Sequence, residues 1–227
     1  MFEDIKLIAF DLDGTLLDSV PDLARAVDLA MQDMGYPRVT LEQASHWIGN
    51  GADVLVSRAL SQNYIVKDDL DAELIKQARA RLDQHYHDGG HQLSHLYPDV
   101  KDTLERLHQQ GYTLALVTNK PSQFVPELLE QHQLTHLFSD VIGGDTFAEK
   151  KPNPFALNWL LDKHGLTAPQ MLMVGDSKND IQAAQAAGCH SFALTYGYNH
   201  GEPISDSQPD VVSDEFKYLL AVLSVAR

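Results

Sequence analysis

A short apolar run near the N-terminus constrains the fold more than any other feature of this sequence. Leu7 to Phe10 are all apolar, and they lead directly into the acidic segment Asp11 to Thr15. A run of this length that ends in a turn is typical of a strand buried on both faces, as in a parallel sheet. Side chains alternate along a strand, so we expect Asp11 and Asp13 on one side, where α/β proteins bind ligands.

This acidic pair has two interpretations. Two carboxylates held close together repel each other and need a cation, a shared proton or water around them. Gly14 indicates a tight turn whose backbone N–H groups can meet an anion. An acidic turn that only solvates a strand end explains the same residues, so the pair alone does not decide the function.

Strand and helix patterns alternate through the second half of the chain. Helices are predicted from Pro98 to Gly111, from Ser122, from Asn153 and up to Gly188, and strands at residues 113–117, 140–142, 171–174 and 191–194. Repeated βα units imply a parallel, right-handed, doubly wound sheet. The sequence therefore predicts an α/β fold.

The stretch between the first strand and Pro98 interrupts this alternation, because it contains only helical patterns. A helix from Ser19 and Pro21 to Gly35, a capping box at Thr40 and Gln43, a helix after residues 49–51 and a long helix from about Lys67 to residues 89–90 are predicted. We expect residues 16–90 to form an inserted, all-helical cap domain, and residues 1–15 and 91–227 to form the core.

Composition limits the partners of this chain. Its 227 residues include 32 acidic and 17 basic side chains, a net charge of −15, which argues against nucleic acid or an anionic membrane as partner. An anionic substrate would need a local cationic patch.

No leader precedes the first strand and the apolar run 218–226 is too short to span a bilayer, so we expect a cytoplasmic protein. The single cysteine, Cys189, is expected to pack as a small apolar residue.

Three further polar clusters follow predicted strands or precede helices. They are Thr118-Asn119-Lys120, Lys150-Lys151-Pro152-Asn153-Pro154 and Gly175-Asp176-Ser177-Lys178-Asn179-Asp180. Each has a purely structural explanation: a capping turn, a solvated pair of lysines and a capped helix. Asp176 and Asp180, however, are one helical turn apart and can face the same point.

Taken together, these clusters favour a metal site over separate structural roles. Four acids, Asp11, Asp13, Asp176 and Asp180, would meet at the ends of strands in one sheet, and a divalent cation would relieve their repulsion. Oxygen ligands without matching histidine or cysteine favour Mg²⁺ over zinc. The cation and Lys151 bring the group close to neutral if Asp13 carries a proton. Lys120, Lys150 and Lys178 supply further positive charge for a phosphate.

In these four motifs the chain resembles the haloacid dehalogenase superfamily of phosphatases: Asp11-Leu12-Asp13-Gly14-Thr15, then Thr118, then Lys151, then Gly175-Asp176 through Asp180. The resemblance covers the core on both sides of the insertion. It implies a Rossmann-like core with a helical cap, and a Mg²⁺-dependent phosphate monoester hydrolase.

The resemblance also implies a role for each motif residue. Asp11 would be the nucleophile and Asp13 the general acid and base, while Thr118 and Lys151 would hold the phosphate oxygens. Asp11, Asp176 and the backbone carbonyl of Asp13 would bind the metal. Asp180 would be either a further ligand or an acceptor that fixes Lys151 or a metal-bound water.

The substrate is less well defined than the reaction. Residues 47–53 and 195–199 are similar to segments of one superfamily member that acts on a small phosphorylated acid. Gly49, Asn50 and Asn119 are candidate substrate-binding residues, although a plain loop at 49–51 explains the glycines equally well. Arg58 is a candidate for binding a substrate carboxylate, with a solvent-facing arginine as the alternative.

Other functions fit the same core. They are a phosphatase of a sugar phosphate, nucleotide or pyrophosphate, a phosphohexose mutase, and a non-enzymatic binding protein. A carbon–halogen hydrolase would have no use for Asp13. The histidines at 85, 87, 91 and 95 span a glycine pair, so a helix end and hinge explain them better than a metal site. The chain is expected to be a monomer or homodimer.

Overall fold

A six-stranded parallel sheet, in the order β5-β4-β1-β6-β7-β8, forms the centre of the core in a computed structural model that describes residues 2–223. Its strands are β1 (Leu7–Phe10), β4 (Thr113–Val117), β5 (Asp140–Ile142), β6 (Met171–Gly175), β7 (His190–Leu194) and β8 (Val211–Ser213). The predicted α/β fold with a doubly wound parallel sheet is confirmed.

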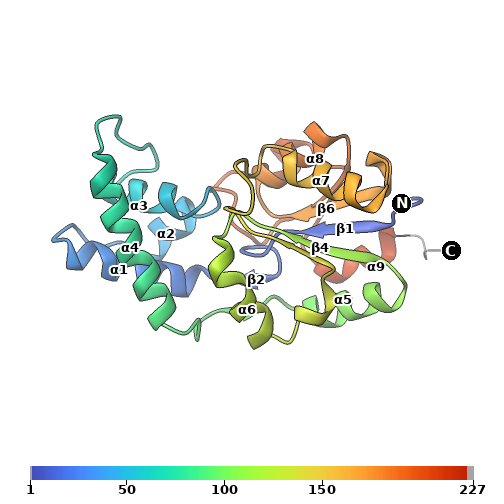
Figure 1. The fold of residues 1–227 in the computed structure, drawn as a ribbon, viewed down its shortest axis with the longest axis horizontal. Helices are drawn as coiled ribbons and strands as arrows, with labels where there is room; N and C mark the ends of the chain where they lie inside the picture. The colour runs from blue at the N-terminus through green and yellow to red at the C-terminus, as the bar shows by residue number, and fades with distance from the viewer. Residues whose placement is uncertain (1, 224–227) are drawn as a thin grey trace.

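Helices cover both faces of this sheet (Figure 1). The helices α5 (Val100–Gln109), α6 (Val125–Gln131) and α9 (Leu219–Val222) lie on one face, and α7 (Phe155–His164) and α8 (Lys178–Ala187) lie on the other. Ile8 and Phe10 pack into the first layer, whereas Leu7 and Ala9 pack into the second. The apolar run of β1 is therefore explained, because each residue is buried on one face or the other.

A second apolar core lies within the inserted helices α1 (Val20–Asp33), α2 (Leu41–Trp47), α3 (Ala52–Ser61) and α4 (Ala72–Asp88). This helical cap lies beside the carboxyl ends of the strands (Figure 1). A short antiparallel ribbon of β2 (Leu17–Asp18) and β3 (His95–Leu96) connects it to the core. The four helices fall inside the predicted stretch 16–90, and the division into separate domains stays a prediction.

Local signals explain where the cap helices begin. The predicted capping box is present, because Thr40 and Gln43 exchange side chain to backbone hydrogen bonds at the start of α2. Helix α4 begins later than predicted, since the side chain of Asp71 accepts a hydrogen bond from the amide of Glu73. In the described residues, no helix is long and apolar enough to cross a membrane.

The histidines near the end of α4 have separate environments. His85 bonds to Asp33, His87 and His95 are exposed, and His91 is buried against the rings of Tyr86 and Phe124. Cys189 is also buried, and burial raises the pKa of its thiol to about 11.

Candidate active site

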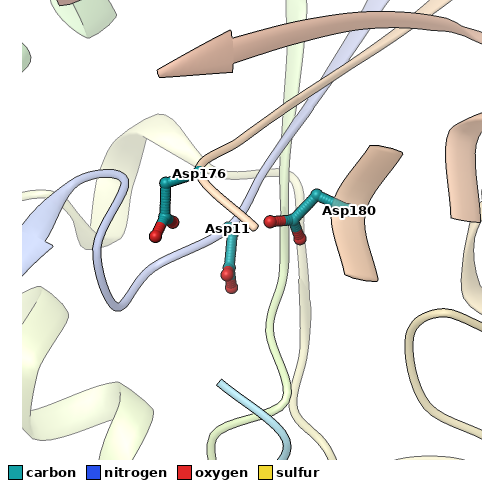
Figure 2. A group of neighbouring side chains, drawn as sticks. All are labelled: Asp11, Asp176 and Asp180. Carbon is teal, nitrogen blue, oxygen red and sulfur yellow. The ribbon is translucent and has the colours of Figure 1, made fainter. Parts of the chain in front are cut away.

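Three carboxylates meet at the carboxyl end of the sheet. Asp11 follows β1, Asp176 follows the neighbouring strand β6, and Asp180 lies in the first turn of α8. One oxygen from each lies within 4.8 Å of the others. Figure 2 shows the three side chains converging on one space. The sheet topology thus brings together acids that are far apart in the sequence.

Three glycines make room for these acids. A Cβ at Gly14 would lie 2.2 Å from Oδ2 of Asp176, and one at Gly197 would lie equally close. A Cβ at Gly175 would lie 2.3 Å from the side chain of Asp180. The amide of Gly14 donates to the carbonyl of Leu17, so among the N–H groups of this turn that of Gly14 is not free to meet an anion. Glycine is needed at residue 14 because Asp176 occupies the space of a side chain.

Lys151 offsets part of the negative charge of this group. Its Nζ lies 2.9 Å from Oδ1 of Asp11 and 2.6 Å from Oδ1 of Asp180. Burial opposes the charge of Lys151, but the two carboxylates outweigh it and raise its pKa. Burial, together with the neighbouring acids, raises the pKa of Asp11 and of Asp176. The carboxylates therefore repel one another even with Lys151 beside them, and the group binds protons more readily than isolated aspartates do.

The donor set fits a hard divalent cation. Asp11, Asp176 and Asp180 offer buried oxygens, as Mg²⁺ prefers. Oδ1 of Asp11 accepts the amide of Leu12 and faces Lys151, which leaves Oδ2 free of partners among the described contacts. Asp180 accepts a hydrogen bond from Lys151 and also belongs to the group of three acids. Its position is therefore compatible with both expected functions, as a metal ligand and as the acceptor that fixes Lys151.

The side chain of Asp13 lies outside this acidic group. Its Oδ1 accepts hydrogen bonds from Nζ of Lys120 at 2.9 Å and from Oγ of Ser19 at 2.6 Å. The expectation that carboxylates surround Asp13 is therefore wrong, because its nearest charged partner is a lysine. Asp13 is not one of the three aspartates whose oxygens lie within 4.8 Å of one another.

Lys120 is the residue that sequence reasoning undervalued. It is buried, and besides Asp13 its Nζ donates to the hydroxyl of Tyr86 on α4 at 2.8 Å. Burial would lower the pKa of Lys120, but Asp13 and Tyr86 raise it, so the side chain stays charged. Burial raises the pKa of Tyr86 to about 12, which keeps its phenol protonated. The sequence placed Lys120 directly after Thr118 and Asn119 and among the lysines that supply positive charge for a phosphate, but it did not indicate these partners.

A small pocket of about 50 Å³ lies between the core and the helical cap. The core supplies Asp11, Asp13, Thr118, Asn119 and Lys120 to its lining, and the cap supplies Gly49, Gly51, Leu55 and Tyr86 among others. Thr118 is buried, and its Oγ1 accepts the amide of Lys120, so its hydroxyl proton is available for a ligand. The pocket thus joins the first acidic motif to the cap.

Asn119 and Gly49, both candidate substrate-binding residues, are hydrogen-bonded to each other. The Nδ2 group of Asn119 donates to the carbonyls of Gly49 at 3.1 Å and Lys151 at 2.9 Å. Nδ2 of Asn179 donates to the same Gly49 carbonyl at 3.0 Å. The amide group of Asn119 is therefore occupied in holding the cap loop. Only its Oδ1, which is buried without a partner, remains for a substrate.

Arg58 does not reach the pocket, which corrects its interpretation as a substrate ligand. Its guanidinium donates to the carbonyls of Trp47 at 2.7 Å and Tyr64 at 3.0 Å and lies over the Tyr64 ring. It is also buried rather than solvent-facing, because α3 turns this position towards the interior of the cap. Asn50 lies beside the pocket lining, with its Oδ1 buried and unpartnered.

The parallel sheet, the inserted cap and the acidic strand ends define a haloacid dehalogenase-like hydrolase. The model of that family matches residues 8–194, and the chain belongs to it. The chain is 99% identical over 227 residues to the phosphoglycolate phosphatase of Aliivibrio fischeri, with both proteins covered in full. It is 64% identical over 224 residues to the protein of the same name from Vibrio parahaemolyticus, covering 99% of this chain and 98% of that one.

Solved structures agree with the assignment of the chain to this family. The crystal structure of a predicted phosphoglycolate phosphatase from Haemophilus somnus superposes with a TM-score of 0.90 at 42% identity. The match covers 98% of this chain and 99% of that one. The similarity therefore extends over the core and the cap together.

Proposed function

We propose that this enzyme hydrolyses 2-phosphoglycolate to glycolate and phosphate through an aspartyl-phosphate on Asp11. The observation that carries this proposal is the free Oδ2 of Asp11 beside a pocket that joins the acidic strand end to the cap. The 99% identical relative that is named a phosphoglycolate phosphatase supports the choice of substrate.

Two displacements at phosphorus complete the proposed reaction. Oδ2 of Asp11 forms a bond to phosphorus as the bond to the glycolate oxygen breaks, and Asp13 gives that oxygen a proton. Asp13 then takes a proton from water, whose oxygen attacks phosphorus and releases Asp11. A carboxylate nucleophile replaces one difficult displacement with two easier ones.

The remaining residues hold and neutralise the phosphoryl group. Lys151 lies 2.9 Å from the nucleophile, and the hydroxyl of Thr118 is free to donate, so both are suited to bind phosphoryl oxygens. We propose that Asp11, Asp176, the carbonyl of Asp13 and, directly or through Lys151, Asp180 hold Mg²⁺. When bound, this ion would neutralise charge between the nucleophile and the phosphate.

The size of the pocket favours a short leaving group. A volume of about 50 Å³ is small for a ligand pocket, which supports a substrate with a short leaving group. We therefore prefer 2-phosphoglycolate to sugar phosphates, nucleotides and the substrates of a phosphohexose mutase.

We also propose that the enzyme works in the cytoplasm as a monomer or homodimer and binds neither nucleic acid nor membranes. The net charge of −15 supports the second part, because phosphate backbones and anionic lipids would be repelled.

A phosphate-release assay tests the proposed function. The purified chain with Mg²⁺ is given 2-phosphoglycolate, glucose 6-phosphate, a nucleoside monophosphate and pyrophosphate, with Asp11→Asn as the inactive control. We expect the highest kcat/KM for 2-phosphoglycolate, and loss of activity when the metal is chelated. Isomerisation of a sugar phosphate without phosphate release would indicate a mutase and contradict the proposal.

A further inference from the structure

The carboxylate of a two-carbon acid needs a positive partner when it leaves water for a pocket, because burying an unpaired charge is costly. Among the described residues that line the pocket, Lys120 is the only cationic side chain. The cap side of the lining is mostly apolar, with Ile48, Leu55 and Leu82, and its one charged residue, Asp83, is acidic. The guanidinium of Arg58, which the sequence offered as a candidate for this role, is occupied by backbone carbonyls.

Lys120 and Tyr86 retain unused hydrogen-bond donors. An ammonium group has three donors, and the described contacts of Lys120 use two of them, to Asp13 and to the Tyr86 hydroxyl. That hydroxyl accepts from Lys120, and its own proton has no acceptor among the described contacts. Two donors therefore lie side by side, 2.8 Å apart, on the wall of the pocket.

The spacing matches a leaving group of two carbons. In 2-phosphoglycolate one methylene separates the ester oxygen from the carboxylate, so with bond lengths near 1.5 Å the two groups lie within about 4 Å. Asp13, which would protonate the ester oxygen, lies 2.9 Å from Nζ of Lys120. A carboxylate attached through one methylene would therefore reach Lys120 while the ester oxygen remains at Asp13.

We propose that Lys120 and Tyr86 form the subsite that binds the substrate carboxylate and sets the preference for a short phosphorylated acid. This inference rests on the proposed function and adds residues that determine its specificity. Lys120 belongs to the core and Tyr86 to α4 of the cap, so the subsite is complete only while the two are in contact. Substrate charge would then help to hold the cap against the core.

A comparison of two substrates tests this subsite. We measure kcat/KM for 2-phosphoglycolate and for 2-hydroxyethyl phosphate, which has the same two carbons but an uncharged hydroxymethyl group in place of the carboxylate. The variants are Lys120→Met and Tyr86→Phe, with Lys76→Met and Tyr36→Phe as matched controls outside the pocket. Lys120→Arg tests whether a positive charge alone restores the preference.

We expect each pocket variant to lower the ratio of the two kcat/KM values by about 10- to 100-fold, through KM for 2-phosphoglycolate, since hydrogen bonds to charged groups are lost. The controls should keep the wild-type ratio. A wild-type preference that survives in both pocket variants overturns the subsite alone. A wild-type enzyme that hydrolyses both substrates equally well also overturns the subsite alone. A wild-type enzyme without activity on 2-phosphoglycolate overturns the subsite together with the proposed function.

Discussion

At the scale of single residues, close packing explains the acidic site better than charge alone. Asp176 is confined by Gly14 and Gly197, and both of its oxygens accept hydrogen bonds, from Thr15 and from the amide of Tyr198. Its carboxylate is therefore held in one position before any ligand arrives. Such positioning reduces the reorganisation needed during phosphoryl transfer.

Gly197→Ala tests the importance of this confinement. The new Cβ would lie 2.2 Å from Oδ2 of Asp176 and would displace it. We expect kcat/KM to fall by at least about 100-fold, since an ångström of misplacement has that effect, and more Mg²⁺ to be needed for half-maximal activity. Gly89→Ala, where the nearest atom would be 3.2 Å away, is the control. Unchanged Mg²⁺ dependence in Gly197→Ala would contradict the argument.

Asp13→Asn separates proton transfer from attack at phosphorus. We expect a loss of about 100- to 10,000-fold on 2-phosphoglycolate, because its alkoxide leaving group needs a proton. The loss of the first step should be smaller on p-nitrophenyl phosphate, whose leaving group is stable without one. Rapid-quench measurement of the p-nitrophenolate burst reports this step. Equal losses of the first step on both substrates would rule out Asp13 as the general acid.

At the scale of elements, the strands were more predictable than their polar connections. The limits of β1 and β4 agree with the sequence patterns because these strands are wholly or almost wholly apolar runs, and the limits of the shorter β5, which begins with Asp140, agree as well. Strand β8 was missed, since its three residues lie at the sheet edge and are partly exposed. The four acidic and basic motifs could be placed at strand ends, but side-chain partners such as Lys120 with Asp13 depend on packing that no local pattern encodes.

Asp140 connects β5, a strand at the edge of the sheet, to helix α7. It begins β5 and accepts hydrogen bonds from Lys163 and His164 at the end of α7. Burial alone would raise the pKa of Asp140, but these hydrogen bonds and that of Ser139 outweigh it and lower the pKa. The negative charge of Asp140 is therefore more stable in the folded chain than in the unfolded one.

We expect Asp140→Asn to lower the free energy of unfolding by about 1.5 kcal/mol near pH 7. Because the folded-state pKa is lowered, the contribution is present above the unfolded value of about 4 and is lost as the pH falls through the folded value. Urea denaturation of wild type and variant between pH 3 and pH 7 measures this difference. A difference that grows on acidification would have the opposite sign and refute the assignment.

At the scale of the whole molecule, one backbone carbonyl of the cap accepts hydrogen bonds from two separate parts of the core. Asn119, in the loop after β4, and Asn179, in the first turn of α8, both donate to the carbonyl of Gly49. His200 adds a further contact, since its Nδ1 lies 3.0 Å from the carbonyl of His46. These contacts hold the cap loop above the acidic group.

Asn179→Ala is expected to weaken this contact without removing a charged group. Loss of one neutral hydrogen bond should lower kcat/KM for 2-phosphoglycolate about 5-fold, mainly by raising KM. Amide hydrogen exchange at residues 48–52 should become faster in the variant. Gln84→Ala, on the exposed side of α4, is the control. Unchanged exchange at residues 48–52 would show that the cap loop does not depend on this contact.

The position of β1 between β4 and β6 also has a consequence for biosynthesis. Leu7 pairs with Thr113 on one side and with Met171 on the other, so the earliest strand to be translated gains its second neighbour very late. Long-range pairing of this kind slows folding and leaves apolar edges exposed in the meantime. A ribosome-bound chain that ends before β6 contains Asp11 but neither Asp176 nor Asp180, so the acidic group is assembled only after β6 has been made.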